Sequence, residues 1–313
     1  MYKVSVIIPT YQSGRFISQA IDSVLTQTYK DFEIIIVDDG STDNTHEVIN
    51  KYATDERIRY YYQTNNGPAA ARNLGIRMSS GENIAFLDAD DLWLPAKLEK
   101  QIKLLEDYPA IDLVFCDAYI FDETGMQQKT LFNLSSPSSG RVLEKLFYLN
   151  FIPLLTVVVR RKVFDVVGYF DETVIGPEDY DLWLRISQTY LIDFIQEPLA
   201  KYRISSGQIS QQQIRMLENE IKVKEKAFSN SPLLLTLTKS VLDKGFFNLL
   251  IRIAKLLLQN NQKKDSRIYL DKYLKLRGFT IRFLAARGLF LLPYTIQRAV
   301  LGIWDSIRMP HTH

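Results

Sequence analysis

Residues 83–95 read NIAFLDADDLWLP, and this stretch decides how the rest of the chain is interpreted. It begins with a short apolar run and stops at three carboxylates, Asp88, Asp90 and Asp91. A short apolar run bounded by polar residues is typical of a strand buried in an α/β sheet. Carboxylates at the end of such a strand lie where open α/β sheets bind ligands. The stretch therefore predicts an α/β fold and a ligand site at one edge of its sheet.

The spacing of the carboxylates indicates a possible metal site. Asp88 and Asp90 are separated by one residue of extended chain, so their side chains point to the same side. Two like charges this close need a cation or hydrogen-bond donors to stay ionised. Mg²⁺ or Mn²⁺, completed by substrate phosphates, would meet that need. An isolated Asp-x-Asp is common, however, and an acidic loop that caps the helix opened by Pro95 also explains it.

Length and composition set wide limits. The chain has 313 residues, of which 46% are hydrophobic, so one or two domains with a large core are expected. A single cysteine, Cys116, excludes an internal disulfide. No long apolar segment of the signal-peptide type follows Met1. Both observations favour a cytoplasmic location.

The net charge of +2 hides a steep asymmetry. Residues 1–200 carry 18 Lys and Arg against 29 Asp and Glu, a net charge of −11, whereas residues 201–313 carry 20 against 7, a net charge of +13. Such a split marks a change of domain and of partner. We expect a catalytic or binding domain over residues 1–205 and a basic domain over residues 206–313.

Strand and helix patterns alternate through the first hundred residues. Apolar runs at 4–9, 32–37 and 58–62 predict buried strands, the first of them ended by a proline. Apolar residues at helical spacing follow the first run, and a helix is predicted again over residues 69–76. This alternation favours a Rossmann-like, mostly parallel sheet flanked by helices.

The predicted strands at 4–9, 32–37 and 83–87 end in polar or aromatic residues that would meet at one edge of the sheet. An aromatic ring that stacks on a base, carboxylates that accept from a ribose, an arginine for phosphate and a metal-binding pair together describe a site for a nucleoside diphosphate. Each has a plainer explanation: a turn and cap, a loop aromatic, or a solvated helix face. The residues are Thr10, Tyr11, Asp38, Asp39, Arg72, Asp88 and Asp90.

Four segments of the chain resemble the successive motifs of the family 2 glycosyltransferases, which are inverting enzymes with the GT-A fold. The segments are residues 4–11 (VSVIIPTY), 37–43 (VDDGSTD), 66–73 (NGPAAARN) and 87–91 (LDADD). The resemblance covers about residues 1–205. It implies a GT-A domain that uses a nucleotide sugar, most often a UDP-sugar, together with Mn²⁺ or Mg²⁺.

The resemblance also implies a role for each residue of these motifs. Asp90 would be the principal metal ligand, and Arg72 and Asp88 would contact the nucleotide or its phosphates. The remaining residues would hold the uridine end of the donor or lie beside it: Pro9, Thr10, Tyr11, Asp38 and Asp39.

A second acidic pair lies in residues 176–186, which read GPEDYDLWLRI. Apolar residues at helical spacing, Trp183 among them, predict a helix, with Glu178 and Asp179 at or before its first turn. Acids there are favoured by the helix dipole, so capping alone accounts for them. The resemblance implies more: Asp179 would be the catalytic base and Glu178 would help to orient the acceptor.

One position departs from the family pattern. Family members often carry Arg-x-His near the end of the catalytic domain, and the corresponding residues here are Arg203, Ile204 and Ser205. The replacement of the histidine by Ser205 bears on two properties: the strength of metal binding and the closure of that loop over the donor.

The last third of the chain reads as helices with a basic surface. Residues 283–294 are apolar but interrupted by Arg287 and Pro293, and they are too short to span a membrane. A helix lying on an anionic membrane surface and a helix packed in a core both fit this pattern. No nucleic-acid motif is present, so we expect no nucleic-acid partner.

The sequence thus predicts an inverting, metal-dependent glycosyltransferase that extends a glycan or a lipid-linked glycan in surface polysaccharide synthesis. The expected location is cytoplasmic, with peripheral attachment to the membrane as an option. Two alternatives remain: a nucleotidyltransferase, although residues 10–15 match its glycine-rich phosphate loop poorly, and a non-catalytic module that binds sugar nucleotides.

Overall fold

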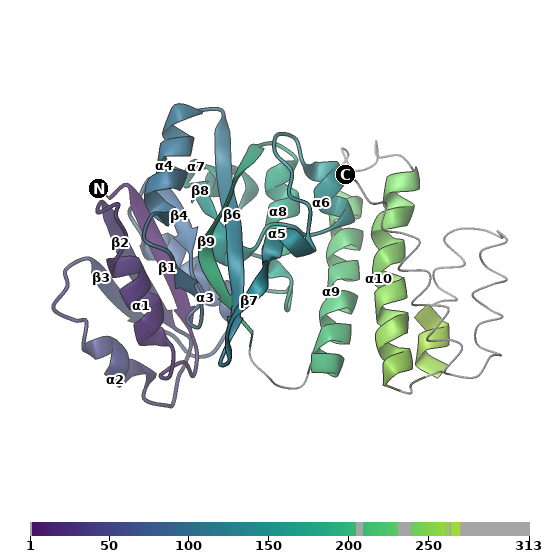
Figure 1. The fold of residues 1–313 in the computed structure, drawn as a ribbon, viewed down its shortest axis with the longest axis horizontal. Coiled ribbons are helices and arrows are strands. Elements are labelled where there is room, and N and C mark those ends of the chain that lie inside the picture. Colours follow the sequence, from purple (N-terminus) through teal and green to yellow (C-terminus); the bar gives the residue numbers. More distant parts are fainter. Residues whose placement is uncertain (1, 205–208, 231–238, 261, 263, 270–313) are drawn as a thin grey trace. The chain divides into compact units, whose positions relative to one another are not determined.

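The computed structural model describes residues 2–204, 209–230, 239–260, 262 and 264–269 (Figure 1). The chain divides into two compact units, residues 1–245 and 246–313. The domain boundary predicted after residue 205 stays a prediction. Ser205 and the apolar stretch 283–294 lie outside the described residues. Among the described residues, no helix is long and apolar enough to cross a membrane.

The first unit is built on a single sheet of nine strands. Eight of them lie in the order β3-β2-β1-β4-β8-β6-β9-β5, and β7 pairs with β6. Their bounds are β1 Val4–Thr10, β2 Phe32–Asp38, β3 Ile58–Tyr62, β4 Asn83–Phe86, β5 Leu92–Trp93, β6 Ile111–Asp122, β7 Gly125–Thr130, β8 Val158–Arg160 and β9 Leu191–Arg203.

Helices connect most of these strands, and in the described residues beyond 206 the chain is helical, as predicted. Their bounds are α1 Ile17–Leu25, α2 Thr45–Asn50, α3 Pro68–Met78, α4 Lys97–Asp107, α5 Leu131–Leu134, α6 Leu143–Tyr148, α7 Lys162–Val167, α8 Glu178–Ser187, α9 Ile209–Asn230 and α10 Lys239–Gln259, with a 3-10 turn at Leu154–Thr156.

The sheet contains both parallel and antiparallel pairings. Parallel pairings join β3, β2, β1 and β4, and another joins β6 to β9. Antiparallel pairings join β8 to both β4 and β6, β5 to β9, and β7 to β6. The alternation that favours a parallel sheet holds only as far as β4, and neither β7 nor β9 is predicted from the sequence. The fold is therefore α/β with a mixed sheet.

Pro9 does not end β1, as the sequence suggested, but lies inside it opposite Val37. The Ile7 carbonyl accepts from the amide of Leu87, so Ile7 and Pro9 both turn their backbone polar groups toward β4. Paired residues on β4 stop at Phe86, opposite Ile7. Pro9 therefore sits where no partner strand needs its missing amide hydrogen.

Helices cover both faces of the parallel part of the sheet (Figure 1). Val4, Val6 and Ile8 pack in one hydrophobic cluster with residues of α1 and α4. On the other face α3 lies so close to β1 that a Cβ on Gly75 would come within 2.5 Å of Ile7 Cγ2. Glycine at this position thus allows α3 to approach the sheet. The two layers fix the carboxyl ends of β1, β2 and β4 at a common edge.

Candidate active site

The strand ends that the sequence singled out meet in the structure. Thr10 is in register with Asp38, and the amide of Asp39 donates to the carbonyl of Thr10 over 2.8 Å. β4 pairs with the other side of β1 and leads directly into Asp88. We call this part of the molecule the acidic edge: the segments 10–12, 38–43 and 87–91, with Arg72, Glu178 and Asp179 beside them.

Asp38 and Asp39 use their carboxylates inside the fold. Asp38 accepts from the amide of Ser41 over 2.9 Å and from the hydroxyl of Tyr60 over 3.0 Å. Asp39 accepts from the amides of Asn66 and Gly67 over 2.9 and 2.8 Å, directly before α3. Both aspartates are buried. Their observed contacts shape the loops around the edge, and their roles toward a ligand stay predictions.

The β1 loop offers two different groups. Thr10 is buried, and its hydroxyl has no hydrogen-bond partner among the described residues. Tyr11 is half exposed, with 51% of its surface accessible, as suits a ring that stacks on a ligand. Gln12, which the sequence did not single out, has a φ of 50° and accepts from the amides of Thr42 and Asp43 through Oε1. Gln12 therefore joins the loop after β1 to the loop after β2.

Arg72 joins the two sides of the site. One nitrogen of its guanidinium donates to Asp88 over 2.7 Å and another donates to Glu178 over 2.6 Å. Arg72 and Glu178 are both buried, and their atoms Nε and Oε2 have no partner among the described residues. The two carboxylates raise the pKa of Arg72 although its burial acts to lower it. Arg72 therefore carries a fixed charge held between the acidic loop and α8.

The acidic loop itself is held by Arg203 at the end of β9. Arg203 donates through Nε to the carbonyl of Asp90 over 2.7 Å, and its amide donates to the carboxylate of Asp91 over 2.8 Å. Its guanidinium lies between the rings of Phe16 and Phe121, at 4.6 and 4.3 Å from their centres. Stacking of this kind fixes the plane of an arginine. The Arg of the Arg-x-His position thus supports the loop.

Burial and mutual repulsion disfavour the ionised form of the carboxylates in the acidic loop. Burial raises the pKa of Asp90, and the charge of Asp88 adds to the effect. Burial likewise raises the pKa of Asp91 well above its usual value, with further contributions from Asp88 and Asp90. A bound cation would stabilise the ionised form of these clustered carboxylates and so lower their pKa values.

Asp179 faces the same cluster from α8. It lies in the first turn of that helix and is partly exposed. Burial, together with the charges of Glu178 and Asp88, raises its pKa to about 7, although Arg72 and the amide of Tyr180 act to lower it. The charge of Asp179 in turn acts on Tyr202, together with those of Asp88, Asp90 and Asp91. The predicted base and the predicted metal-binding loop therefore share one site.

The metal predicted from the sequence fits the residues present because Asp90 and Asp88 can supply one or two carboxylate ligands. No group of three His, Cys, Asp or Glu side chains suited to a metal is found among the described residues. A Mg²⁺ or Mn²⁺ that takes one or two carboxylates and completes its shell with phosphates and water does not need such a group. Asp90, with Asp88 beside it, offers that donor set, and the raised pKa of Asp90 is consistent with it.

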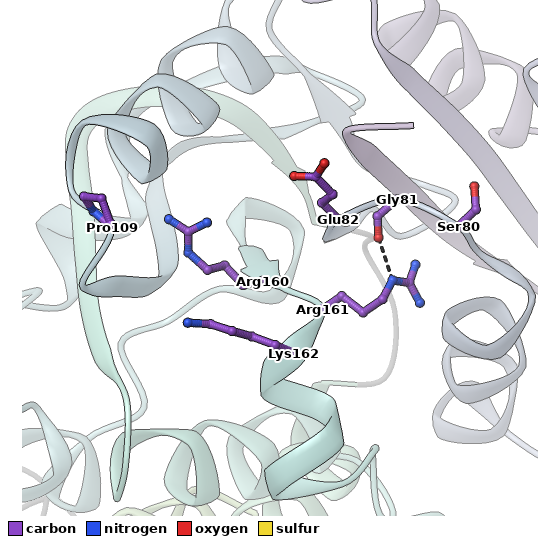
Figure 2. A pocket seen from close by; sticks show the side chains of 7 residues that line it. All are labelled: Ser80, Gly81, Glu82, Pro109, Arg160, Arg161 and Lys162. Atoms are coloured by element: carbon purple, nitrogen blue, oxygen red, sulfur yellow. Dashed lines mark hydrogen bonds between the residues drawn. The ribbon is translucent and has the colours of Figure 1, made fainter. Parts of the chain in front are cut away.

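A pocket of about 410 Å³ lies elsewhere, at the amino ends of β4 and β6. We call it the basic pocket. Figure 2 shows that Arg160 and Lys162 extend into it, whereas Arg161 turns toward Gly81 and donates to its carbonyl over 2.6 Å. The lining residues are Ser80, Gly81, Glu82, Pro109, Arg160, Arg161 and Lys162. None of them was predicted to form the site.

The family model for glycosyl transferase family 2 matches residues 5–168, and the chain belongs to that family. Its members have the GT-A fold, and this chain shares that fold with the solved structures described next.

Solved structures of similar fold are under 25% identical to this chain. A mannosyltransferase from Pyrobaculum calidifontis, solved with GDP-Man and Mn²⁺, has a TM-score of 0.64 and 21% identity, and the match covers 97% of this chain and 88% of that one. TarS 1–349 from S. aureus, solved with UDP-GlcNAc, has a TM-score of 0.57 and 19% identity, with coverage of 88% and 90%.

Relatives by sequence carry the name glycosyltransferase. A Rickettsia bellii protein described as an uncharacterized glycosyltransferase is 41% identical over 208 residues, which are 64% of this chain but only 29% of that protein. An Escherichia coli protein, the UDP-Glc:alpha-D-GlcNAc-diphosphoundecaprenol beta-1,3-glucosyltransferase WfgD, is 33% identical over 230 residues, 70% of this chain and 84% of its own length. The chain thus spans only about a third of the length of the first Rickettsia relatives that it matches.

Proposed function

We propose that this glycosyltransferase is inverting and metal-dependent, and that it moves a sugar from a UDP-sugar to a glycan or lipid-linked glycan acceptor. The observation that supports this best is the meeting of Asp179 with the acidic loop across Arg72 and Glu178. An enzyme of this kind needs a base on one side of the anomeric carbon and positive charge on the other.

Inverting transfer is a single in-line displacement at the anomeric carbon. Asp179 takes the proton from the acceptor hydroxyl while the oxygen of that hydroxyl forms the new bond and the bond to the diphosphate breaks. A base works best when its pKa is close to the working pH, and the pKa of Asp179 is raised to about 7. Glu178 orients the acceptor side and helps to set that pKa.

Positive charge for the departing diphosphate has two sources in this proposal. Asp90, with Asp88, would hold Mn²⁺ or Mg²⁺, which when bound neutralises charge on the phosphate oxygens. Arg72, buried beside Asp88, adds a permanent cation. Because Arg72 is already paired with two carboxylates, it acts at the edge of the diphosphate and also keeps Asp88 in place.

The nucleotide end would lie over the ends of β1 and β2. Tyr11 is exposed and can stack on the base, and the unpartnered hydroxyl of Thr10 can bond to the donor. In this proposal Pro9 and Asp39 help to hold the uridine end of the donor, and Asp38 lies nearby, where it accepts from the amide of Ser41.

One relative supports a proposal for the acceptor and the cellular setting. WfgD is named as acting on a diphosphoundecaprenol-linked sugar, and WfgD matches this chain over 84% of its own length. We extend that class of acceptor to this chain and place the reaction in surface polysaccharide synthesis, on the cytoplasmic face of the membrane with peripheral attachment.

The test is a transfer assay with UDP- and GDP-sugars in the presence of Mn²⁺, Mg²⁺ or EDTA, with polyprenyl-diphosphate-linked and soluble acceptors. We expect turnover with a UDP-sugar, its loss in EDTA and its return with Mn²⁺. NMR of the product should show an anomeric configuration opposite to that of the donor. Retention of configuration, or full turnover in EDTA, would contradict the proposal.

A further inference from the structure

The loop of residues 168–177 joins α7 to α8 and leads directly into Glu178 and Asp179. Any displacement of this loop moves the first turn of α8, and the first turn carries the base. A misplacement of about 1 Å is enough to cost an enzyme up to ~100-fold in rate. The contacts that fix this loop are therefore contacts that fix the base.

The first half of the loop is held by α3 and α8. The side chain of Asn73, next to Arg72 in α3, accepts from the amide of Phe170 and donates to its carbonyl, both over 3.0 Å. Arg185 of α8 donates to the carbonyl of Val167 over 2.6 Å. These contacts lie within the part of the chain to which the resemblance extends.

The second half of the loop is held by α9. Asn219 donates to the carbonyl of Ile175 over 2.7 Å. Met216 packs against Gly176, where a Cβ would come within 2.5 Å of its sulfur. Gly176 also has a φ of +103°, a conformation that favours glycine. Helix α9 thus approaches the backbone of the loop one and two residues before Pro177.

Lys226 adds two charged contacts from α9. Its ammonium group donates to Asp171 of the loop and to Asp181 of α8, each over 2.6 Å. Asp181 has only 3% of its side chain exposed, and Arg185 binds its other oxygen. The bond from Lys226 also lowers the pKa of Asp171. One cation therefore fastens the loop to the helix that bears Asp179.

We propose that α9 is a working part of the active site and that Lys226 is a positioning residue, which holds the loop 168–177 against α8 so that Asp179 meets the acceptor hydroxyl. This inference rests on the proposed function, because it assumes that Asp179 is the base. It assigns a catalytic task to a helix that begins at Ile209, beyond the family-model match at residues 5–168.

The experiment compares Lys226→Met with wild type in the full chain. Methionine keeps much of the side-chain length and removes the charge, and Arg185 still pairs with Asp181 in the variant. We expect kcat to fall about 10- to 100-fold, with KM for the donor within about twofold, because the loop and not the nucleotide site is released. Lys226→Arg, which can still bridge two carboxylates, should recover most of kcat. Arg215→Met, an exposed charge on the same helix, should change neither constant.

The concentration of folded sites is measured by calorimetric titration with UDP and Mn²⁺, so that kcat is counted per binding-competent molecule. Partial unfolding would lower the number of sites, whereas misplacement lowers the rate per site. An unchanged rate per site in Lys226→Met would overturn the proposal. Full activity of Asp179→Asn would instead overturn the proposed base, so the two failures are distinguishable.

Discussion

In the loop after β4 the carboxylates of Asp88, Asp90 and Asp91 repel one another, whereas at the amino end of β4 the cations have partners. Arg160 donates to the carbonyls of Leu105 and Ile111, and Lys162 pairs with Asp112 at 2.7 Å. At the acidic edge, in contrast, the pKa values of Asp90 and Asp179 are raised. The basic pocket is hollow and its cations are hydrogen-bonded or paired, whereas carboxylates with raised pKa values gather at the acidic edge.

This difference teaches that the volume of a hollow is a poor guide to chemistry. The cations around the basic pocket donate to backbone carbonyls at the ends of helices and strands or pair with Asp112. Burial at the acidic edge disfavours the ionised carboxylates and so lowers the stability of the fold. Groups that are perturbed in this way cluster at functional sites. The predictions below test the two regions against each other.

The largest expected effect is that of Asp179→Asn. The amide keeps the shape of the carboxylate but cannot accept the proton, so kcat should fall about 10²- to 10⁴-fold in the transfer assay. A loss of less than tenfold would show that another residue is the base. The acidic edge would then no longer differ from the basic pocket in its catalytic role.

Thermal unfolding serves as its control. The pKa of Asp179 is raised in the folded protein, so folding favours the protonated acid, and the ionised carboxylate costs stability as the pH rises from about 4 to 7. Asparagine avoids this cost. Asp179→Asn should therefore melt no lower than wild type at pH 8, which separates lost chemistry from lost folding.

Asp90→Ala tests the metal side of the acidic edge. We expect a loss of about 10²- to 10³-fold in kcat/KM, in line with the removal of a group that fixes charge at the leaving diphosphate. Mn²⁺ titration of the UDP complex should show weakened metal binding in the same variant. Asp107→Asn, an exposed carboxylate at the end of α4, provides the matched control and should behave as wild type. Equal Mn²⁺ affinity in both variants would exclude Asp90 as the ligand.

The pH dependence of kcat/KM gives a sharper, smaller effect. Asp179 must be deprotonated to act, and its pKa is raised to about 7. The rate should rise about tenfold per pH unit well below pH 7 and level off above about pH 8. In Glu178→Gln the neighbouring charge is gone, so the midpoint should move to lower pH. A midpoint that stays in place in this variant would show that Glu178 does not act on the base.

The smallest effect on activity is expected at the basic pocket. Arg161 donates to the carbonyl of Gly81 and to the hydroxyl of Ser79, so Arg161→Met should lower the free energy of unfolding by about 1–3 kcal/mol. Its kcat should stay within about twofold of wild type. Chemical denaturation and the transfer assay measure the two quantities. A large loss of kcat without a loss of stability would make the basic pocket a second functional site.

Much of the fold and part of the site could be predicted from the sequence. The strands β1 to β4 are short apolar runs ended by polar residues, and that pattern carries both their type and their order. The long β9 could not be found in this way, because it is partly exposed and its side chains show no clean alternation. The antiparallel pairings of β8 with β4 and β6 could not be predicted either, because an apolar run indicates a strand and not the direction in which it pairs.

Contacts between distant segments were the main omission. The motifs named Arg72, Asp88 and Glu178 separately, but nothing in their spacing indicates that one guanidinium joins the other two. Gln12 and Lys226 belong to no motif, and their roles emerge only from the partners that the fold brings to them. Sequence reasoning finds the groups that do chemistry more readily than those that hold them in place.

The support of the acidic loop by Arg203 has a consequence for the order of folding. The bond from Arg203 to Asp90 spans 113 residues, so the mutually repelling carboxylates leave the ribosome long before their clamp is synthesised. Closing a contact across such a separation is slow relative to forming local structure. We therefore expect the scaffold of the first four strands to form early and the acidic loop to reach its final structure late, when β9 takes its place in the sheet.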